Sequence, residues 1–180
     1  MEKKFILTDK FVINSFGIKL FQIKCTKSFK YAQKGDFGGY VEKEGNLDQE
    51  NDAWVSGNAR VFGNAWVFGD AWVFGDALVS GNARVFGNAR VFGNAWVSGD
   101  ADIENDNEHC GFDGFGSCNR HTHAYMTKEK KVEIICGCFR GSIEEFEKKV
   151  EETHSGTVYE KQYKSIINVI KIKFGLTDFT

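Results

Sequence analysis

The chain has 180 residues, a formal net charge of −2 and a composition that includes 20 Gly and no Pro. This length accommodates one compact domain or two small ones. The near-neutral charge argues against direct binding of nucleic acid, and no apolar run is long enough to cross a membrane. The start Met-Glu-Lys-Lys lacks the apolar stretch of a signal peptide, and the five cysteines are an odd number. We therefore expect a cytoplasmic protein with reduced thiols.

Residues 1–48 are predicted to form N-terminal strands that cap the rest of the fold. Apolar side chains alternate within residues 4–25, which predicts two strands. Residues 34–47 (KGDFGGYVEKEGNL) lead irregularly into the repeat that follows, with Val41 and Leu47 as early inward-facing positions.

Residues 49–108 contain a six-residue repeat, which decides the fold class. From Val55 the chain reads VSGNAR, VFGNAW, VFGDAW, VFGDAL, VSGNAR, VFGNAR, VFGNAW and VSGDAD. A Gly followed by Asn or Asp in every unit breaks helices, so each unit is predicted to be a short strand and a tight corner. Val suits a buried strand position and Ala a cramped corner, while Gly with Asn or Asp suits positive φ.

The repeat closely resembles the hexapeptide repeat of left-handed parallel β-helices, in which three hexads form one coil of 18 residues. The resemblance implies a mainly β protein whose eight hexads make fewer than three coils. Both ends of so short a stack need covering, since an open strand edge invites aggregation. The flanking segments are the expected caps.

Stacking at 18 residues predicts three outward-facing columns of side chains. The first contains Trp54, Trp72 and Arg90 beside Ser56, Phe74 and Phe92; the second Arg60, Leu78 and Trp96 beside Phe62, Ser80 and Ser98; the third Trp66, Arg84 and Asp102 beside Phe68, Phe86 and Glu104. So many outward rings form a larger apolar patch than a monomer normally exposes. They are either buried against flanking segments or in a homo-oligomer, with a trimer favoured, or they form a recognition surface with Arg84 or Arg90.

A polar, Gly-rich linker is predicted to follow Ile103, and residues 109–180 are predicted to form a small α+β domain. Ala124–Thr127 and Val132–Cys138 read as a hairpin. The capping boxes Ser142-x-x-Glu145 and Thr157-x-x-Glu160 each open an amphipathic helix, and Gly156 ends the first. The alternating tail Ile170–Phe174 is compatible with a returning strand.

The histidines argue against an enzyme of the kinds that are common among hexapeptide-repeat proteins. Acyltransferases of this type use a His as general base, and carbonic anhydrase-like enzymes bind zinc through histidines. The hexads contain no His, because His109, His121, His123 and His154 all lie after them. We expect His154 to act at a helix C-terminus, and we expect no catalytic residue.

A zinc site is the alternative for the thiols and imidazoles of the C-terminal domain. The candidate ligands are Cys110, Cys118, His121, His123, Cys136 and Cys138. Their spacing matches no familiar zinc knuckle, and free Cys usually packs as a small apolar residue. We therefore expect core cysteines, with neither metal nor cofactor.

Beyond the repeat, the whole chain resembles a group of small phage and prophage proteins of gut Firmicutes. The lead-in LFQIKCTKSF with KGDFGGYVEKEGNL, the hexads, and the ending GSCNRHTHAY…CGCFRGSIEEFEKKVEETHSGTVYEKQY carry the resemblance. It implies provenance and fold, because a fold alone does not specify function.

These features lead us to expect a non-catalytic accessory binding protein acting in the host cytoplasm. It would inhibit a host defence effector, such as a CRISPR nuclease, or sequester a nucleotide signal. For a protein partner we expect the aromatic prism or residues 104–120 as the docking surface. For a nucleotide we expect Arg120, Arg140 and the CGCFRG turn near a helix N-terminus. A virion assembly protein is the first alternative and an acyltransferase the second.

Overall fold

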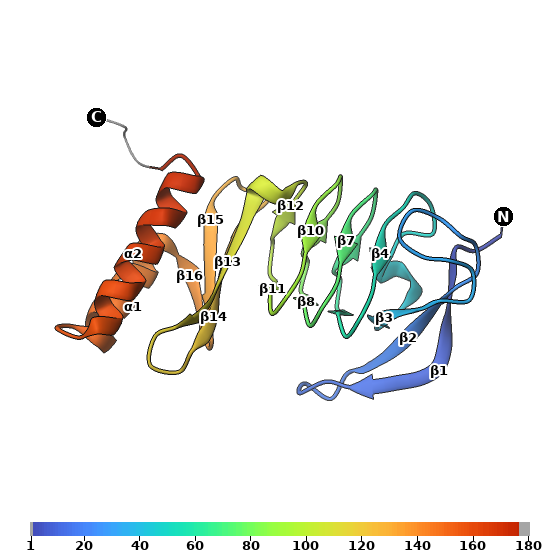
Figure 1. Cartoon of the computed structure of the whole chain (residues 1–180), viewed down its shortest axis with the longest axis horizontal. Coiled ribbons are helices and arrows are strands. Elements are labelled where there is room, and N and C mark those ends of the chain that lie inside the picture. Colours follow the sequence, from blue (N-terminus) through green and yellow to red (C-terminus); the bar gives the residue numbers. More distant parts are fainter. Residues whose placement is uncertain (1, 177–180) are drawn as a thin grey trace. The chain divides into compact units, whose positions relative to one another are not determined.

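A computed structural model describes residues 2–176 of the chain. The chain divides into two compact units, Met1–Asp106 and Asn107–Thr180, which are drawn with their elements in Figure 1. Within the described residues, no helix is both long and apolar enough to span a membrane.

The N-terminal unit begins with an antiparallel hairpin, which confirms the two strands predicted in residues 4–25. Strands β1 (Phe5–Ile13) and β2 (Lys19–Cys25) pair along their length. The Asn14 side chain closes the turn by accepting hydrogen bonds from the backbone N–H groups of Phe16 (3.0 Å) and Ile18 (2.9 Å). Gly17 follows with a φ of 76°, a conformation that costs Gly little.

The solenoid begins before the first regular hexad. Strand β3 (Phe37–Val41) pairs with β2 on one side and runs parallel to a coil strand on the other, with Val41 opposite Val61. Leu47 forms a parallel bridge to Val67. Val41 and Leu47 are 0% and 2% exposed, which confirms both as inward positions. The stack therefore has about four turns, more than the eight hexads alone predict.

Between these two positions, η1 (Glu44–Asn46) replaces a regular corner. The buried Asn46 amide donates to the carbonyl oxygens of Gly63 (3.1 Å) and Ala65 (2.8 Å). No regular corner precedes these two carbonyl groups in the stack, so the Asn46 side chain takes the place of the backbone N–H groups that would otherwise bond to them.

The strands from β4 to β12 are two residues long, and together with β3 they stack in parallel in the orders β3-β5-β8-β11, β4-β7-β10 and β6-β9-β12 (Figure 1). Their bounds are β4 Trp54–Val55, β5 Arg60–Val61, β6 Trp66–Val67, β7 Trp72–Val73, β8 Leu78–Val79, β9 Arg84–Val85, β10 Arg90–Val91, β11 Trp96–Val97 and β12 Asp102–Ile103.

The interior of the solenoid is aliphatic, as the repeat predicts. Every Val of the eight hexads is 0% exposed, and the corner Ala residues are at most 3% exposed. The corner Gly residues have φ between 60° and 72°. The Asn and Asp that follow them do not share this conformation, which corrects the role predicted for them. Their side chains instead bond from coil to coil, as in Asn58 to Asp76 at 3.1 Å.

The first coil is covered by the N-terminal strand region. The Lys4 ammonium donates to the carbonyl oxygens of Glu50 (2.8 Å), Asn51 (3.1 Å) and Ala53 (2.8 Å). Burial lowers the pKa of Lys4 to about 8, although Asp48 and Asp52 oppose the shift. This buried amine fastens the start of β1 to the loop that precedes β4.

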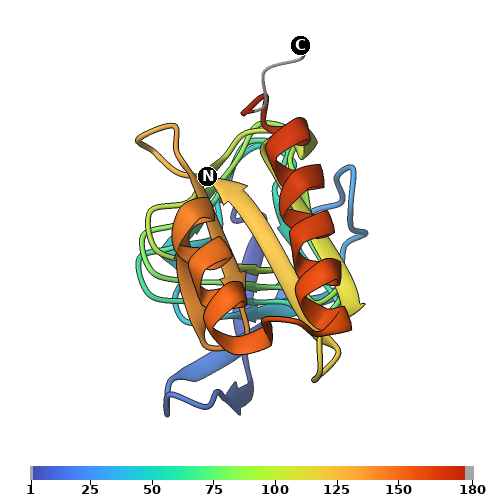
Figure 2. The same ribbon diagram turned by 90° about the vertical axis from the view of Figure 1, so that its left-hand side faces the viewer.

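The C-terminal unit is a four-stranded antiparallel sheet with two helices on one face (Figure 2). The strands are β13 (His109–Phe115), β14 (Arg120–Met126), β15 (Val132–Cys136) and β16 (Phe139–Ser142), and η2 (Asp106–Glu108) precedes them. The hairpin predicted around residues 128–131 is confirmed. The predicted linker is wrong in part, because β13 occupies much of it and pairs with β14.

Both predicted helices are present. Helix α1 (Ile143–His154) has the predicted capping box, in which Ser142 and Glu145 bond reciprocally. Helix α2 (Val158–Lys173) is capped by Thr157, whose side chain accepts from the Glu160 N–H. The predicted second capping box is incomplete, because the Glu160 carboxylate accepts from the Gly156 N–H (2.7 Å) and not from Thr157. The strand predicted for Ile170–Phe174 is wrong, because α2 continues through this segment and keeps Ile170 in the core.

The core of this unit lies between the sheet and the helices. Ile134 and Cys136 of β15 pack with Phe146 of α1 and with Tyr163 and Ile167 of α2. Alternation along the strands therefore places even-numbered residues of β14 and β15 on the helix-covered face.

Candidate functional site

The outward side chains of the solenoid lie in the predicted columns. Trp72 pairs with Trp54 on one side and with Arg90 on the other. Arg84 likewise pairs with Trp66 and with Asp102. The columns differ in how they are covered, so each is described separately.

We name the column on β6, β9 and β12 the Trp66 face, formed by Trp66, Phe68, Arg84 and Phe86. The rings of Trp66 and Phe68 stack at 4.0 Å between centroids, and those of Phe68 and Phe86 at 4.9 Å with planes 2° apart. The Arg84 guanidinium lies 5.3 Å and 4.9 Å from the centroids of Phe68 and Phe86. Trp66 is still 42% exposed. These rings form an ordered, accessible apolar surface.

Arg84 is held in place on the Trp66 face. Its guanidinium is 3.4 Å from the Asp102 carboxylate of the next coil. The ring contacts and the ion pair together restrict the side chain, so that little conformational entropy remains to be lost on binding.

The column on β4, β7 and β10 is named the Trp72 face and contains Trp72, Phe74, Arg90 and Phe92. Phe74 stacks on Trp72 at 4.2 Å and on Phe92 at 5.2 Å. Tyr31, from the N-terminal region, stacks on Trp72 at 4.9 Å, whereas Phe92 is 53% exposed. The Trp72 face is thus covered at one end and open at the other.

Arg90 has an acidic partner on this face. Its Nε is 2.8 Å from Asp106 Oδ2, and its backbone N–H donates to Oδ1 of the same residue at 2.8 Å. These contacts raise the pKa of Arg90. Trp72 donates its indole N–H to Ser56 at 2.9 Å.

Trp54 belongs to the same column but is buried beneath the N-terminal region. It is 1% exposed, because Phe5 and Phe29 pack edge-on against its ring at 6.4 Å and 5.3 Å. The sequence predicts that the Trp54 side chain points outward and is either buried against a flanking segment or exposed for recognition. The structure shows it buried, so Trp54 contributes to stability and takes no part in the candidate surface.

The column on β5, β8 and β11 has fewer rings available. Phe62 is buried and packs against Phe16 at 6.1 Å, and Ser80 and Ser98 are buried as well. Trp96 is half-buried, and its indole N–H has no hydrogen-bond partner among residues 2–176. This column offers no continuous aromatic surface.

Arg120 and Arg140, the two arginines predicted to bind a nucleotide, lie in different surroundings in the C-terminal unit. Arg140 of β16 forms an ion pair with Glu133 at 2.7 Å. Arg120, at the start of β14, lines a pocket together with Cys138 and Phe139 of the CGCF turn. The structure therefore brings Arg120, but not Arg140, to that pocket.

Three of the four histidines lie together on β13 and β14. His109 Nδ1 is 3.2 Å from His123 Nε2, and His121 Nδ1 is 2.7 Å from the Asp113 carboxylate. Burial, and secondarily the neighbouring His109 and His121, lowers the pKa of His123 well below its usual value. The neutral imidazole is thus the stable form at this position. Sequence alternation places His121 and His123 on one face, but the proximity of His109 depends on the unpredicted strand β13.

The cysteines do not converge with these histidines. Cys136 is buried, with the Thr122 hydroxyl donating to it at 3.3 Å. Cys110 is half-buried, and burial raises its pKa to about 11. Cys118 and Cys138 are exposed, contrary to the expectation of core cysteines. Across the part of the chain that the structure describes, no group of three or more His, Cys, Asp or Glu could hold a metal ion.

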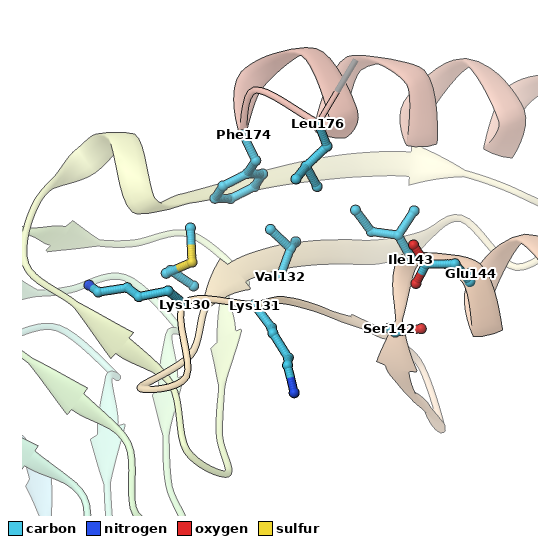
Figure 3. A pocket seen from close by; sticks show the side chains of 9 residues that line it. Lys130, Lys131, Val132, Ser142, Ile143, Glu144, Phe174 and Leu176 are labelled. Carbon is cyan, nitrogen blue, oxygen red and sulfur yellow. The ribbon is translucent and has the colours of Figure 1, made fainter. Parts of the chain in front are cut away.

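A pocket of about 290 Å³ lies where β15 meets the two helices, in the C-terminal unit (Figure 3). Val132, Ile143, Phe174 and Leu176 provide most of its walls, while Lys131 extends away from them. The polar residues that line this pocket are Lys130, Lys131, Ser142 and Glu144.

The comparisons with known proteins support the class of the fold. A family model described as the YdcK beta-solenoid repeat matches residues 53–69 and 83–99. Both stretches lie within the coils, so the chain is a β-solenoid repeat protein. The match spans only part of the repeat and does not extend to the C-terminal unit. The search of curated proteins found no match.

Proposed function

We propose that this chain is a non-catalytic binding protein that engages a protein partner through the Trp66 face. The observation that carries the proposal is the stack of Trp66, Phe68 and Phe86, with Arg84 across the rings. Trp and Arg are enriched among the residues that dominate binding energy at protein interfaces. The Trp66 face presents both in an ordered array, in which the Asp102 carboxylate offsets the charge of Arg84.

The proposal extends to the kind of partner, a host defence effector such as a CRISPR nuclease, bound stoichiometrically in the host cytoplasm. This part is supported by the resemblance of the lead-in, the hexads and the ending to phage and prophage hexapeptide-repeat proteins of gut Firmicutes. The rigid solenoid supports the binding mode, because a surface on stacked strands keeps its shape when a partner docks.

The test is a plating assay in bacteria that carry a defence system restricting a phage. We expect the wild-type chain to restore plating and the double variant Trp66→Ala/Phe86→Ala to lose this effect. Phe92→Ala is the matched control, since it removes an exposed ring from the Trp72 face. Equal loss in the control would contradict the assignment of the Trp66 face. Failure of the wild-type chain against every defence system tested would contradict the anti-defence role.

The competing use of the Trp66 face is contact between copies of the chain, as in the trimer expected from the sequence. Light scattering of the wild type and of the double variant separates the two uses. If the mass falls from that of a trimer to that of a monomer, the face serves self-assembly and the partner-binding role is wrong. An unchanged mass together with lost protection supports the proposal.

A further inference from the structure

A second, smaller pocket in the C-terminal unit combines cationic and aromatic side chains. It has a volume of about 200 Å³ and is formed by helix α1, Tyr163 of α2, and the ends of β14 and β15 with the turn between β15 and β16. The polar and charged side chains that line it are Arg120, Lys149, Thr153 and His154, together with the Cys138 thiol and the Tyr163 phenol. No Asp or Glu side chain is among the lining residues.

Arg120 is positioned by a glycine. Gly137 has a φ of 60°, and a Cβ at this residue would lie 2.5 Å from Arg120 Nη1 and 2.8 Å from Cδ. The arginine side chain therefore lies directly across the CGC turn, in space that only Gly leaves open. Among residues 2–176, no carboxylate lies within ion-pair distance of this guanidinium.

The second cation is Lys149 of α1. It pairs with Glu152 at 3.5 Å, but both side chains are more than half exposed, so water screens this pair strongly. The ammonium and the Arg120 guanidinium together give the pocket a positive potential that no lining carboxylate offsets.

Four rings line the pocket: Phe139 and His154 are partly exposed, whereas Phe146 and Tyr163 are 3% and 5% exposed and lie behind them in the core. His154 stacks on Tyr163 at 5.5 Å between centroids, Phe146 meets Tyr163 edge-on at 5.6 Å, and Phe139 packs on Phe146 at 5.0 Å. Burial and the nearby Cys136 thiol raise the pKa of Tyr163, so that its phenol remains protonated and able to donate. The partly exposed rings of Phe139 and His154 favour contact with a planar ring, while two cations favour an anion.

We propose that this pocket binds a small anion that carries one planar ring. Its volume is below the range of about 300–1,000 Å³ typical of drug-sized ligands, which favours a single ring over linked rings. Two sources share this chemistry: a free aromatic acid and a pyrimidine nucleoside monophosphate. The site is independent of the binding role proposed for the solenoid, because every lining residue belongs to the C-terminal unit.

The experiment is isothermal titration calorimetry of the full chain with phenyl phosphate, benzoate and uridine monophosphate. Inorganic phosphate and uridine serve as the separate halves of the ligand. We expect saturable one-to-one binding of at least one ring-bearing anion and at least tenfold weaker binding of either half. Tighter binding of uridine monophosphate identifies a nucleotide site, and tighter binding of benzoate identifies a site for aromatic acids.

Variants assign the binding to the pocket. Arg120→Gln should weaken it at least tenfold and Lys149→Gln about threefold, whereas Lys148→Gln, on the same helix but outside the pocket, should leave it unchanged. Thr153→Phe should block the pocket while both cations remain. Thermal unfolding checks that each variant is folded.

The proposal is overturned if no ring-bearing anion binds saturably at millimolar concentration. It is also overturned if Arg120→Gln and Thr153→Phe both bind like the wild type, or if inorganic phosphate binds as tightly as phenyl phosphate. The Trp66→Ala/Phe86→Ala variant should bind these ligands normally. A loss of protection by this variant in the plating assay would therefore support the role of the Trp66 face without contradicting the binding pocket.

Discussion

The solenoid and the C-terminal unit place their aromatic side chains in opposite ways. The solenoid fills its interior with Val and Ala and leaves rings such as Trp66 and Phe92 outside. The C-terminal unit buries Phe146 and Tyr163 between its sheet and helices. All four histidines and four of the five cysteines also lie in the C-terminal unit.

This difference follows from the repeat. A coil of fixed dimensions accepts only small or branched residues inside, so variety is confined to the outward positions. The C-terminal core has no repeating constraint, and each of its positions can be filled differently. The solenoid therefore provides a regular surface for contact, while pockets and titratable clusters form in the irregular unit.

The largest expected effect comes from two tryptophans at the same position of the repeat. Trp54→Ala should lower the free energy of unfolding by about 3–5 kcal/mol, because it opens a cavity beneath Phe5 and Phe29. Trp66→Ala should cost less than about 1 kcal/mol, since its ring is partly exposed. Chemical denaturation measures both. Similar losses in the two variants would show that cover by the N-terminal region does not distinguish these positions.

A smaller loss is expected at the attachment of β1. Lys4→Met leaves the carbonyl oxygens of Glu50, Asn51 and Ala53 without their donor, and should cost about 1–3 kcal/mol. Lys3→Met is the control, because Lys3 makes only an exposed ion pair with Glu44 and should change stability by less than about 1 kcal/mol. Urea unfolding measures the free energy of unfolding of both variants. Equal losses would contradict the role of Lys4 in attaching β1 to the first coil.

The C-terminal unit should differ from the solenoid in its response to pH. The folded state holds His123 neutral, whereas the unfolded chain takes up a proton below its ordinary pKa of 6.5. Stability that is fully present above this pH should therefore fall by about 1.4 kcal/mol per pH unit below it. His123→Gln should remove this part of the pH dependence, and His154→Gln should retain it. Urea unfolding between pH 7.5 and 5.5 provides the test, and identical slopes in all three proteins would contradict it.

The smallest expected difference concerns two corner glycines. Gly81→Ala and Gly93→Ala share the strain of a positive φ, worth about 1 kcal/mol. A Cβ at Gly81 would also lie 2.7 Å from the backbone nitrogen of Gly99, whereas nothing lies within 4 Å of one at Gly93. Thermal unfolding should show Gly81→Ala to be the less stable by about 1 kcal/mol. Equal melting temperatures would mean that the stack yields to the added methyl group.

The coil was predictable because its residues repeat. The inward Val and the corner Gly follow from a period of six, whereas the pairing of Trp66 with Arg84 follows from the 18-residue coil that the resemblance to left-handed β-helices implies. The first turn was harder to predict, since β3 and Leu47 enter the stack without the hexad pattern. Which of the outward rings are exposed was not predictable, because Phe5 and Phe29 cover Trp54 from distant parts of the sequence.

In the C-terminal unit, local signals predicted local structure. The Ser142 capping box located α1, and the hairpin was read from alternation. Strand β13 was missed because its Gly residues resemble a linker, and its place is decided by pairing with β14. The Arg120 pocket brings together residues of β14, β15, β16 and two helices, so the sequence indicated some of its residues but not their convergence.

The stacking register has a consequence for how the protein can change in length. Deleting one hexad would rotate every later side chain onto the neighbouring sheet and disperse the Trp66 face. Duplicating a whole coil would preserve the register and extend the same column by one rung. Related chains with longer or shorter solenoids should therefore differ by complete coils. Such a column could grow to fit a larger partner without rebuilding the rings that it already contains.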